Sequence, residues 1–160
     1  MTGPTIRLAE LADAPRLNAA LQKLSQTMGD THRADDLAIA EAGFGKTPAF
    51  YAELAEEGDQ IVGVAVYSPL FSTVRGKAGV YVSDLWVDEA ARGQRLGVRL
   101  LEAVRDDAKA RWGAGFLRLV VYDDNPRAVS FYAGLGFRSS TGETVMTLED
   151  SALTAMGENL

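Results

Sequence analysis

The chain has no cysteine, a single histidine and no long hydrophobic run. Without cysteine it can form no disulfide and has no thiol nucleophile, so covalent catalysis through a cysteine is excluded. Its only histidine, His32, has no partner histidine or cysteine at metal-ligand spacing, so we expect it on the surface and predict no metal site. The longest apolar run, residues 61–66, is far shorter than the roughly 20 residues that cross a bilayer.

Positive charge is also scarce, with 16 lysines and arginines against 22 acidic residues and a formal net charge of −6. Nucleic-acid binding needs a basic face, and the basic residues are scattered, so we predict no nucleic-acid partner. A cationic substrate fits an acidic chain, but a mildly acidic surface that only serves solubility is the commoner explanation. The amino terminus lacks the apolar stretch of a signal peptide, and we expect a soluble cytoplasmic protein without a membrane partner.

The length and composition favour one domain. A chain of 160 residues with 47% hydrophobic residues can bury a sizeable core, and no domain boundary, repeat or low-complexity segment is visible. We therefore predict a single domain over residues 1–160.

The most informative segment is the glycine-bearing stretch 92–97, which lies between an apolar run at 80–87, typical of a buried strand, and an amphipathic helix. The apolar face of that helix consists of Leu96, Leu100, Leu101, Val104 and Ala108. Its first amides lack intrahelical partners and the helix dipole adds positive charge, so an anion would be stabilised there. An ordinary strand-to-helix connection explains this segment alone equally well. The patterns of nucleoside-triphosphate loops and dinucleotide folds are absent.

A second informative segment begins with a strand-like run at 116–122 and a turn at 123–126. The Asn125 side chain can cap a following helix, and Pro126 suits its first position. Gly134 or Gly136 can end this short helix in a left-handed conformation.

Together the two segments resemble the GNAT acetyltransferase superfamily. Its loop usually reads Arg/Gln-x-x-Gly-x-Gly/Ala and its later helix Asn-x-x-Ala-x-x-Phe-Tyr-x-x-x-Gly-Phe. The second pattern is matched at every fixed position, by Asn125, Ala128, Phe131, Tyr132, Gly136 and Phe137. The first is matched except that Arg95 stands where the loop usually has its first glycine.

The resemblance implies acetyl-CoA as cosubstrate. The cofactor-binding residues it implies are Leu85, Trp86, Val87, Arg92, Gly93, Gln94, Arg95, Leu96, Gly97, Val98, Asn125, Ala128 and Phe131. Backbone groups of 85–87 would bind pantetheine where the strands ending at 87 and 122 diverge, and amides of 93–98 would hold the diphosphate. Arg95 either adds charge to this phosphate cradle or turns outward while only its amide binds.

The resemblance also suggests two catalytic residues. Tyr132 would be the general acid that protonates the departing CoA thiolate, whereas at an arbitrary helical position a tyrosine is more often a core residue. Asp84 is the candidate general base for the amine, with a plain sheet-edge carboxylate an equal alternative and a water chain a second route for the proton.

Two further segments, 36–45 with its Gly-Phe-Gly ending and 81–87, look like the subgroup that acts on diamines, polyamines and thialysine. Asp84 matches one of an acidic pair typical of that subgroup, while Ser83 replaces the other. We expect an N-acetyltransferase in which the primary amine of a small molecule (diamine, polyamine or amino-acid-like) attacks directly. A protein or peptide N-acetyltransferase and a non-catalytic acyl-CoA-binding regulatory module are the alternatives.

The remaining elements complete an α/β prediction. We expect strands at 5–10, 49–56, 60–68 and 144–149, with a hairpin at 57–59, and a helix near 34–42. Asp13 can cap an earlier helix that carries Leu17, Ala20, Leu21, Leu24 and Met28 on one face. The order predicts a mixed, mostly antiparallel central sheet with helices on both faces. It is also the order of the GNAT fold, and the resemblance to that fold implies a splayed parallel strand pair that binds acetyl-CoA.

Some residues allow two interpretations. Trp86, Tyr81, Phe50 and Tyr51 either line an acceptor pocket or, more commonly for strand aromatics, belong to the core. Ser130 has no acid-base partner that the sequence identifies, and we regard it as structural. The segment 150–160 carries Leu153 and Met156 on one helix face, which could pack on the domain or on a second subunit in a homodimer.

Overall fold

The structure, a computed structural model, describes residues 2–158 in two compact units. The first unit ends at Val120, and the second begins at Val121. We describe each unit by itself, and the prediction of a single domain stays a prediction.

The first unit is built on a five-stranded sheet with the order β1-β2-β3-β4-β5. Its strands are β1 (Thr5–Leu8), β2 (Tyr51–Glu57), β3 (Gln60–Ser72), β4 (Lys77–Val87) and β5 (Leu117–Leu119). The first four pair antiparallel, and β4 and β5 pair parallel. This confirms the mixed, mostly antiparallel sheet. The hairpin is also confirmed, because only Gly58 (φ 61°) and Asp59 separate β2 from β3.

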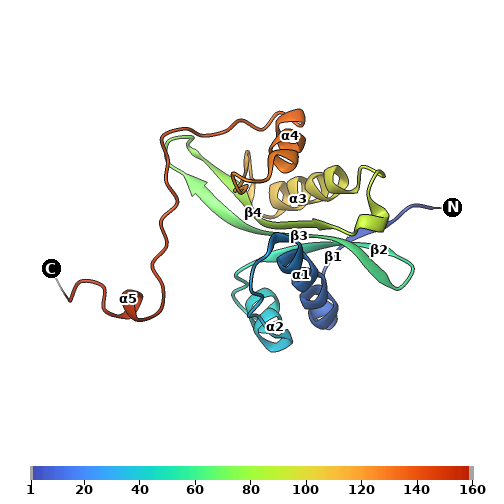
Figure 1. The fold of residues 1–160 in the computed structure, drawn as a ribbon, viewed down its shortest axis with the longest axis horizontal. Coiled ribbons are helices and arrows are strands. Elements are labelled where there is room, and N and C mark those ends of the chain that lie inside the picture. The colour runs from blue at the N-terminus through green and yellow to red at the C-terminus, as the bar shows by residue number, and fades with distance from the viewer. Residues whose placement is uncertain (1, 159–160) are drawn as a thin grey trace. The chain divides into compact units, whose positions relative to one another are not determined.

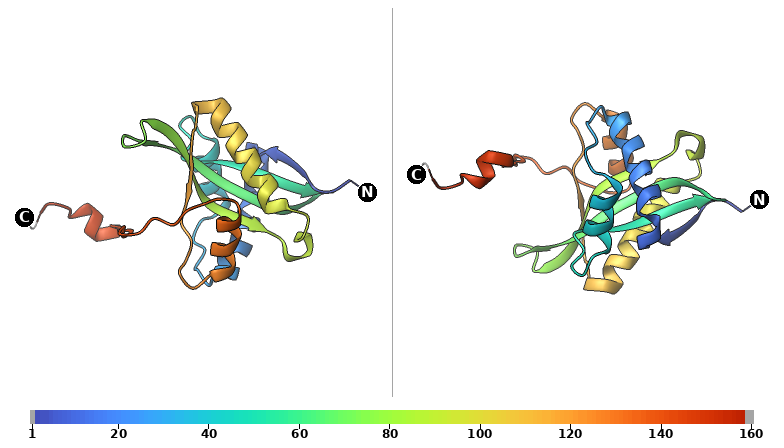
Figure 2. Two further views of the ribbon diagram at one scale, coloured as in Figure 1. Left: turned by 90° about the horizontal axis from the view of Figure 1, so that it is seen from above. Right: turned by 90° about the horizontal axis from the view of Figure 1, so that it is seen from below.

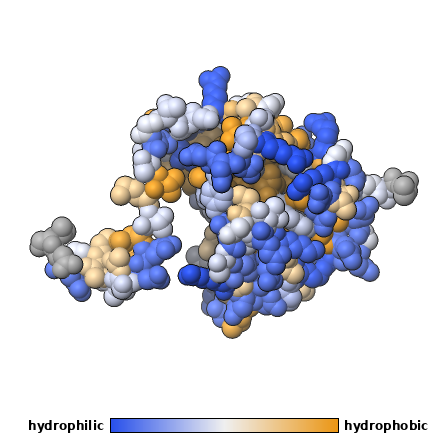
Figure 3. Space-filling view, in the orientation of Figure 1, coloured by the Kyte–Doolittle hydropathy of each residue, from blue (hydrophilic) through white to orange (hydrophobic). Residues whose placement is uncertain are grey.

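Helices cover both faces of the sheet, as predicted. One face carries α1 (Ala14–Met28) and α2 (Asp36–Phe44), and α3 (Leu96–Trp112) crosses the other (Figures 1 and 2). Two short 3-10 helices, η1 (Leu11–Asp13) and η2 (Glu89–Ala91), precede α1 and α3. The surface formed by α1 and α2 is mainly hydrophilic (Figure 3), so their apolar residues serve the core.

Each face of the sheet has its own core. Under α1 and α2 the buried side chains include Leu17, Leu21, Ile39, Leu54, Val64, Val66 and Trp86. Under α3 they include Ala65, Tyr67, Val80, Val82, Leu96, Leu100, Val104 and Ala108. The apolar face predicted for α3 is therefore confirmed, with Leu101 buried as well.

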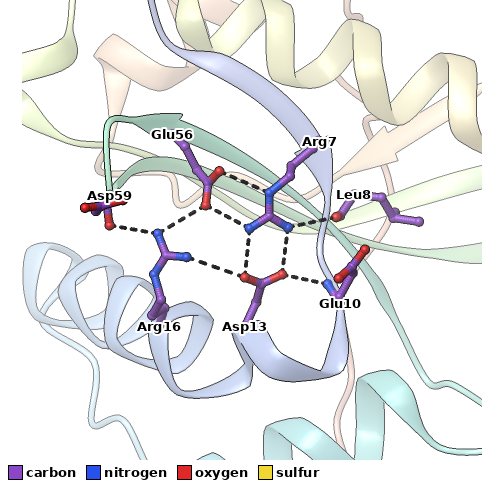
Figure 4. Close-up of polar contacts among 7 residues, drawn as sticks. All are labelled: Arg7, Leu8, Glu10, Asp13, Arg16, Glu56 and Asp59. Carbon is purple, nitrogen blue, oxygen red and sulfur yellow. Dashed lines mark hydrogen bonds and ion pairs between the residues drawn. The ribbon is translucent and has the colours of Figure 1, made fainter.

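A network of ion pairs connects β1, β2 and the start of α1 (Figure 4). The Arg7 guanidinium donates to both carboxylate oxygens of Asp13 and of Glu56, at 2.8 to 3.0 Å. Arg16 adds an ion pair of 3.1 Å to Glu56. Hydrogen bonding to Arg7 lowers the pKa of Asp13 to about 2 and also lowers the pKa of Glu56.

The same network corrects the expected cap of α1. Asp13 occupies the N-cap position, but its carboxylate makes no capping hydrogen bond to α1. It accepts instead from Arg7 and from the amide of Glu10, 2.8 Å away, and so closes the turn of η1. The Asp13 carboxylate binds Arg7 of β1 and not the first amides of α1, because a bidentate hydrogen bond to a charged guanidinium is stronger than a capping hydrogen bond to an amide.

Side chains also fasten both ends of α3 within the first unit. Near its start, Arg99 donates to the carbonyl of buried Pro4 at 2.7 Å. Near its end, the indole N–H of Trp112 donates to the carbonyl of Gly79 at 2.9 Å. Gly79 itself lies against the ring of Phe116, which a Cβ at this position would approach to 2.5 Å. These contacts fix the direction in which α3 leaves the sheet.

The second unit contains α4 (Pro126–Gly134) and α5 (Asp150–Thr154). The strand expected at 144–149 is wrong: the chain there is irregular, and Val145 and Met146 are exposed. A segment with apolar residues forms a strand only when a neighbouring strand supplies hydrogen bonds. The helix expected over 150–160 is observed only as α5, and residues 159–160 lie outside the described residues.

The strand expected at 116–122 is shorter than predicted, since β5 spans only Leu117–Leu119. Along the described part of the chain, no helix is long and apolar enough to span a membrane.

Candidate active site

The first feature of the site is the point where β4 loses one neighbour. The parallel pairs of β4 and β5 end at Val82 and Leu119, yet β4 continues to Val87 beside β3. Among the described residues, no strand therefore pairs with the outer edge of 83–87. The resemblance implied a divergence of the strands ending at 87 and 122. In the structure β5 already ends at Leu119, and the unpaired edge of β4 beyond it leaves backbone groups available to an extended ligand.

A β-bulge at Ser83 decides which backbone groups face that open edge. Val66 on β3 pairs with Asp84 and the next residue, Tyr67, pairs with Val82, so Ser83 is the extra residue of β4. Beyond the bulge, the amide of Asp88 donates to Val62 on β3 at 2.8 Å.

Antiparallel strands alternate between residues whose N–H and C=O face the partner strand and residues whose groups face away. Counting back from Asp88, the groups of Trp86 and Asp84 face β3. The N–H and C=O of Leu85 and Val87 therefore face the open edge.

The loop 92–95 connects this edge with α3 and is exposed. Gly93 has a φ of 90°, and a Cβ placed on it would meet no heavy atom within 4 Å, so the loop surface is open there. The first i to i−4 bond of α3 runs from the amide of Arg99 to the carbonyl of Arg95 at 3.0 Å. The amides of Leu96, Gly97 and Val98 precede that bond and are the free donors at the positive end of the helix dipole.

Arg95 adopts a glycine-like conformation. It is the N-cap of α3 with φ 55° and ψ 26°, in the left-handed region, and its side chain is exposed and does not cap the helix. The loop thus keeps the backbone geometry that a glycine would have, although an arginine occupies the position.

Asp84 and Trp86 lie on opposite sides of Leu85 along the strand and share the sheet face that carries α1 and α2. The hydroxyl of Ser83 donates to the Asp84 carboxylate at 2.7 Å, and Asp84 is half-buried. Trp86 is a core residue of that face, with Lys23 Nζ 5.6 Å from its ring centroid. Tyr51 also packs in an aromatic group, with its ring 5.6 Å from that of Trp112. For Trp86 the core interpretation is correct. Tyr51 is only half-buried and lines a surface pocket together with Phe44 and Arg111.

The second unit places its four predicted residues on one short helix. The Asn125 side chain accepts from the amide of Ala128 at 3.1 Å, and Pro126 is the first residue of α4, which confirms both capping predictions. The ring of Tyr132 makes edge contacts with Phe131 and Phe137, at 5.1 and 5.4 Å between centroids. Burial raises the pKa of Tyr132, so its phenol keeps its proton at neutral pH.

A glycine in the left-handed conformation follows the end of α4, as predicted. The helix ends at Gly134, and Gly136 has the left-handed φ of 97°.

The expectation for His32 is wrong. Its ring is half-buried and bridges two side chains of α1, with Nε2 2.7 Å from the Asn18 oxygen and Nδ1 3.1 Å from the Ser25 hydroxyl. Asn18 in turn donates to Asp36 at 2.9 Å, so the network fastens the start of α2 to α1. These contacts join positions up to 18 residues apart, which no local pattern reveals.

The site residues fall into two groups. Asp84, 85–87 and 92–98 lie on the continuous segment from the end of β4 to the start of α3. In the second unit, Ala128, Phe131 and Tyr132 lie on α4 and Asn125 is its N-cap. Between residues 2 and 158, no cluster of three or more histidine, aspartate and glutamate side chains could hold a metal ion.

An open strand edge followed by a helix start with free amides is the arrangement that the resemblance to acetyltransferases implies, and the family comparison agrees. The model of the Acetyltransferase (GNAT) family matches residues 17–137. The chain therefore belongs to the GNAT family and is an N-acetyltransferase.

Among curated proteins, it is 30% identical over 146 residues to the thialysine N-epsilon-acetyltransferase of Bos taurus, covering 85% of each chain. It is 35% identical to an N-acetyltransferase of Bacillus subtilis, over 86% of this chain and 91% of that one. An integron cassette protein from the mobile metagenome of V. cholerae shares the fold, with a TM-score of 0.80 at 21% identity over 98% of both chains.

Proposed function

We propose that this chain transfers the acetyl group of acetyl-CoA to the primary amine of a small molecule. The observation that carries the proposal is the pair of outward-facing amides of Leu85 and Val87, beside a loop that leads into the start of α3. An extended chain of amides, such as pantetheine, can complete the open edge of β4 as a strand would. When bound, acetyl-CoA supplies an activated acetyl group as a thioester.

The loop residues suit the phosphate end of the same cosubstrate. Free amides of 93–98 and the positive end of the α3 dipole stabilise an anion, and Arg92 and Arg95 add charge. The open space at Gly93 allows a phosphate to approach the backbone closely. The Val87 amide would donate to the thioester carbonyl oxygen and stabilise the negative charge that develops there.

The amine must lose a proton before it attacks, since aliphatic amines have a pKa of roughly 10. We propose Asp84 as the acceptor of that proton, directly or through water. Its carboxylate lies within two residues of Trp86, accepts a hydrogen bond from Ser83 and is half-buried. The bulge at Ser83 places it on the α1 and α2 face, which is therefore the face where we expect the amine.

The proposed general acid is Tyr132. Its role rests on the sequence motif of α4 and on a phenol that burial keeps protonated. It would donate its proton to the departing thiolate. Tyr132→Phe should lower turnover by roughly 100-fold or more while the affinity for CoA stays nearly constant.

A small amine is the acceptor class favoured by the relatives, because a protein 30% identical over most of the chain is named for acetylating the ε-amine of thialysine. Ser83 stands where we expected the second acid of the diamine and polyamine subgroup, which favours an acceptor with one essential cation over a long polyamine. A protein or peptide acceptor is the second candidate.

A thiol-release assay with acetyl-CoA tests the proposal. The panel should contain thialysine, lysine, ornithine, diamines, spermidine and lysine-containing peptides, with Tyr132→Phe and Ser130→Ala as paired variants. We expect amine-dependent release that is lost in Tyr132→Phe and kept in Ser130→Ala. Tight CoA binding without release for any acceptor would indicate a non-catalytic acyl-CoA-binding module instead. Equal turnover of Tyr132→Phe, where chemistry limits the rate, would remove the acid role.

A homodimer is a separate proposal, for which the likeness to the diamine and thialysine subgroup is the only support. Light scattering of the purified chain over a concentration series measures its mass directly.

A further inference from the structure

A group of buried and half-buried polar side chains lies between the sheet and the carboxyl-terminal half of α3. It consists of Glu53 on β2, Tyr67 on β3 and Asp107 on α3, and none of them belongs to the proposed catalytic machinery. Glu53 is 6% exposed and Tyr67 is fully buried. The Tyr67 hydroxyl lies 2.7 Å from Oδ2 of Asp107 and 3.4 Å from Oε1 of Glu53.

The number of hydrogens in this group decides its protonation. A tyrosine hydroxyl has one hydrogen, so it can donate to one carboxylate only. The contact to Asp107 takes that hydrogen, because it is the shorter of the two and the Asp107 side chain also forms an ion pair with Arg111 at 3.0 and 3.2 Å. The contact between Glu53 and the Tyr67 oxygen is then a hydrogen bond only if Glu53 supplies a proton.

The charges around Glu53 also favour its protonated form. Its strand neighbours, Leu8 on β1 and Ala65 on β3, are apolar. The groups that face it from α3 are Asp107, which is negative, and Arg111, whose guanidinium is already bound to Asp107 and lies 4.4 Å from the ring centroid of Tyr51. Burial and the charge of Asp107 raise the pKa of Glu53 to about 7, and burial also raises the pKa of Tyr67.

We propose that Glu53 is a neutral carboxylic acid in the folded protein at mildly acidic to neutral pH, and that the directed chain from Glu53 through Tyr67 to Asp107 is a proton-dependent latch between the sheet and α3. When Glu53 loses its proton, two carboxylates compete for one tyrosine hydrogen and repel each other in a buried place. The latch then weakens at the carboxyl-terminal half of α3.

The latch lies away from the cofactor loop. Asp107 is 12 residues beyond Arg95 on the same helix, which at a rise of 1.5 Å per residue is about 18 Å. The stability of the fold should therefore respond to this proton, while direct contacts to the phosphates should not. The inference is independent of which amine is acetylated.

A direct measurement on the unaltered chain is a pH titration of the Glu53 side-chain carboxyl carbon by NMR, with Glu57 as the internal reference. Glu57 is exposed at the end of the same strand. We expect Glu53 to titrate with a midpoint near pH 7. A midpoint for Glu53 at the ordinary value for a glutamate would overturn the proposal.

The second measurement follows the unfolding equilibrium by urea denaturation from pH 5 to 8. The pKa of Glu53 is raised on folding, so its stabilisation is complete below about pH 4.5 and is lost as the pH rises through about 7. We expect this to weaken folding of the unaltered chain by about 100-fold relative to Glu53→Gln, whose amide stays neutral and can still donate to Tyr67.

Glu57→Gln, the matched control, should keep the pH dependence of the unaltered chain. The same slope in Glu53→Gln as in the unaltered chain would refute the latch. If Glu53→Gln does not fold, the NMR titration decides.

Discussion

Arg95 stands where the loop pattern of the family usually has a glycine, yet its backbone adopts the left-handed conformation that glycine favours. The residue holds φ 55° and ψ 26°, a conformation that costs a residue with a Cβ about 1–2 kcal/mol and costs glycine almost nothing. Replacing Arg95 by glycine should therefore relieve strain at the start of α3. Replacing it by alanine removes the same charge and side chain but keeps the Cβ and hence the strain.

The net effect is smaller than the strain, because glycine gains freedom in the unfolded chain that costs about 0.5–1 kcal/mol on folding. We expect Arg95→Gly to be about 0.5–1 kcal/mol more stable than Arg95→Ala. For a chain of 160 residues, this corresponds to a Tm difference of about 1–4 °C. Urea denaturation of the two variants, with thermal unfolding beside it, measures the difference.

The affinity for CoA distinguishes the effect of the Arg95 charge from the effect of its backbone conformation. Arg95 is exposed, so its contribution to binding a phosphate is on the order of 0.2–1 kcal/mol, or at most about fivefold in Kd. Both variants should lose this amount equally, as titration calorimetry at low salt would show. Equal stability of the glycine and alanine variants would refute the left-handed geometry of Arg95. A much weaker affinity of the glycine variant alone would show that binding needs a stiff loop.

Two other predictions concern the packing and ion pairs of the first unit. Gly79→Ala should destabilise the chain by about 1–3 kcal/mol in urea denaturation, because its Cβ would approach the Phe116 ring to 2.5 Å; a neutral effect would mean that the ring moves freely. The pKa of Asp13 is lowered on folding to about 2, so its ion pair with Arg7 stabilises the fold above about pH 4 and is lost as the pH falls towards 2. Asp13→Asn should lose about 1–2 kcal/mol at pH 6 and have a shallower acid slope, and a slope equal to that of the unaltered chain would contradict the assignment.

Local patterns predicted most of the first unit. The alternating and apolar runs that became β2, β3 and β4 are bounded by turn residues, and the helical spacing from Leu96 to Ala108 gave α3 and its buried face. The cap of α4 by Asn125 was predictable for the same reason, since the donor and acceptor lie three residues apart. Where a residue's partner is close in sequence, composition and spacing suffice.

The predictions that failed concern residues whose partners lie outside their own local segment. Arg7 binds the Asp13 side chain and at the same time binds Glu56, which is 49 residues from Arg7 in the sequence. His32 is held by Asn18, 14 residues away. The burial of Glu53 was not predicted in either direction, because it depends on contacts with the distant helix α3. The segment at 144–149 contains apolar residues such as Val145 and Leu148, but a strand forms only where a neighbouring strand pairs with it.

The bulge at Ser83 shows why the site itself was only partly readable. In a regular strand, the groups of Val82 that face β5 would be followed by those of Asp84 and Trp86, and the Asp84 side chain would lie with Val82 on the α3 face. The extra residue reverses both assignments: Leu85 and Val87 now present their amides to the open edge, and Asp84 turns to the face of α1 and α2. Pairing of β4 with β5 also ends at Val82, directly before the bulge. The extra residue Ser83 thus lies where the open edge begins. It determines which amides face that edge and on which face of the sheet the Asp84 side chain lies, and the identities of residues 83–87 alone do not predict these features.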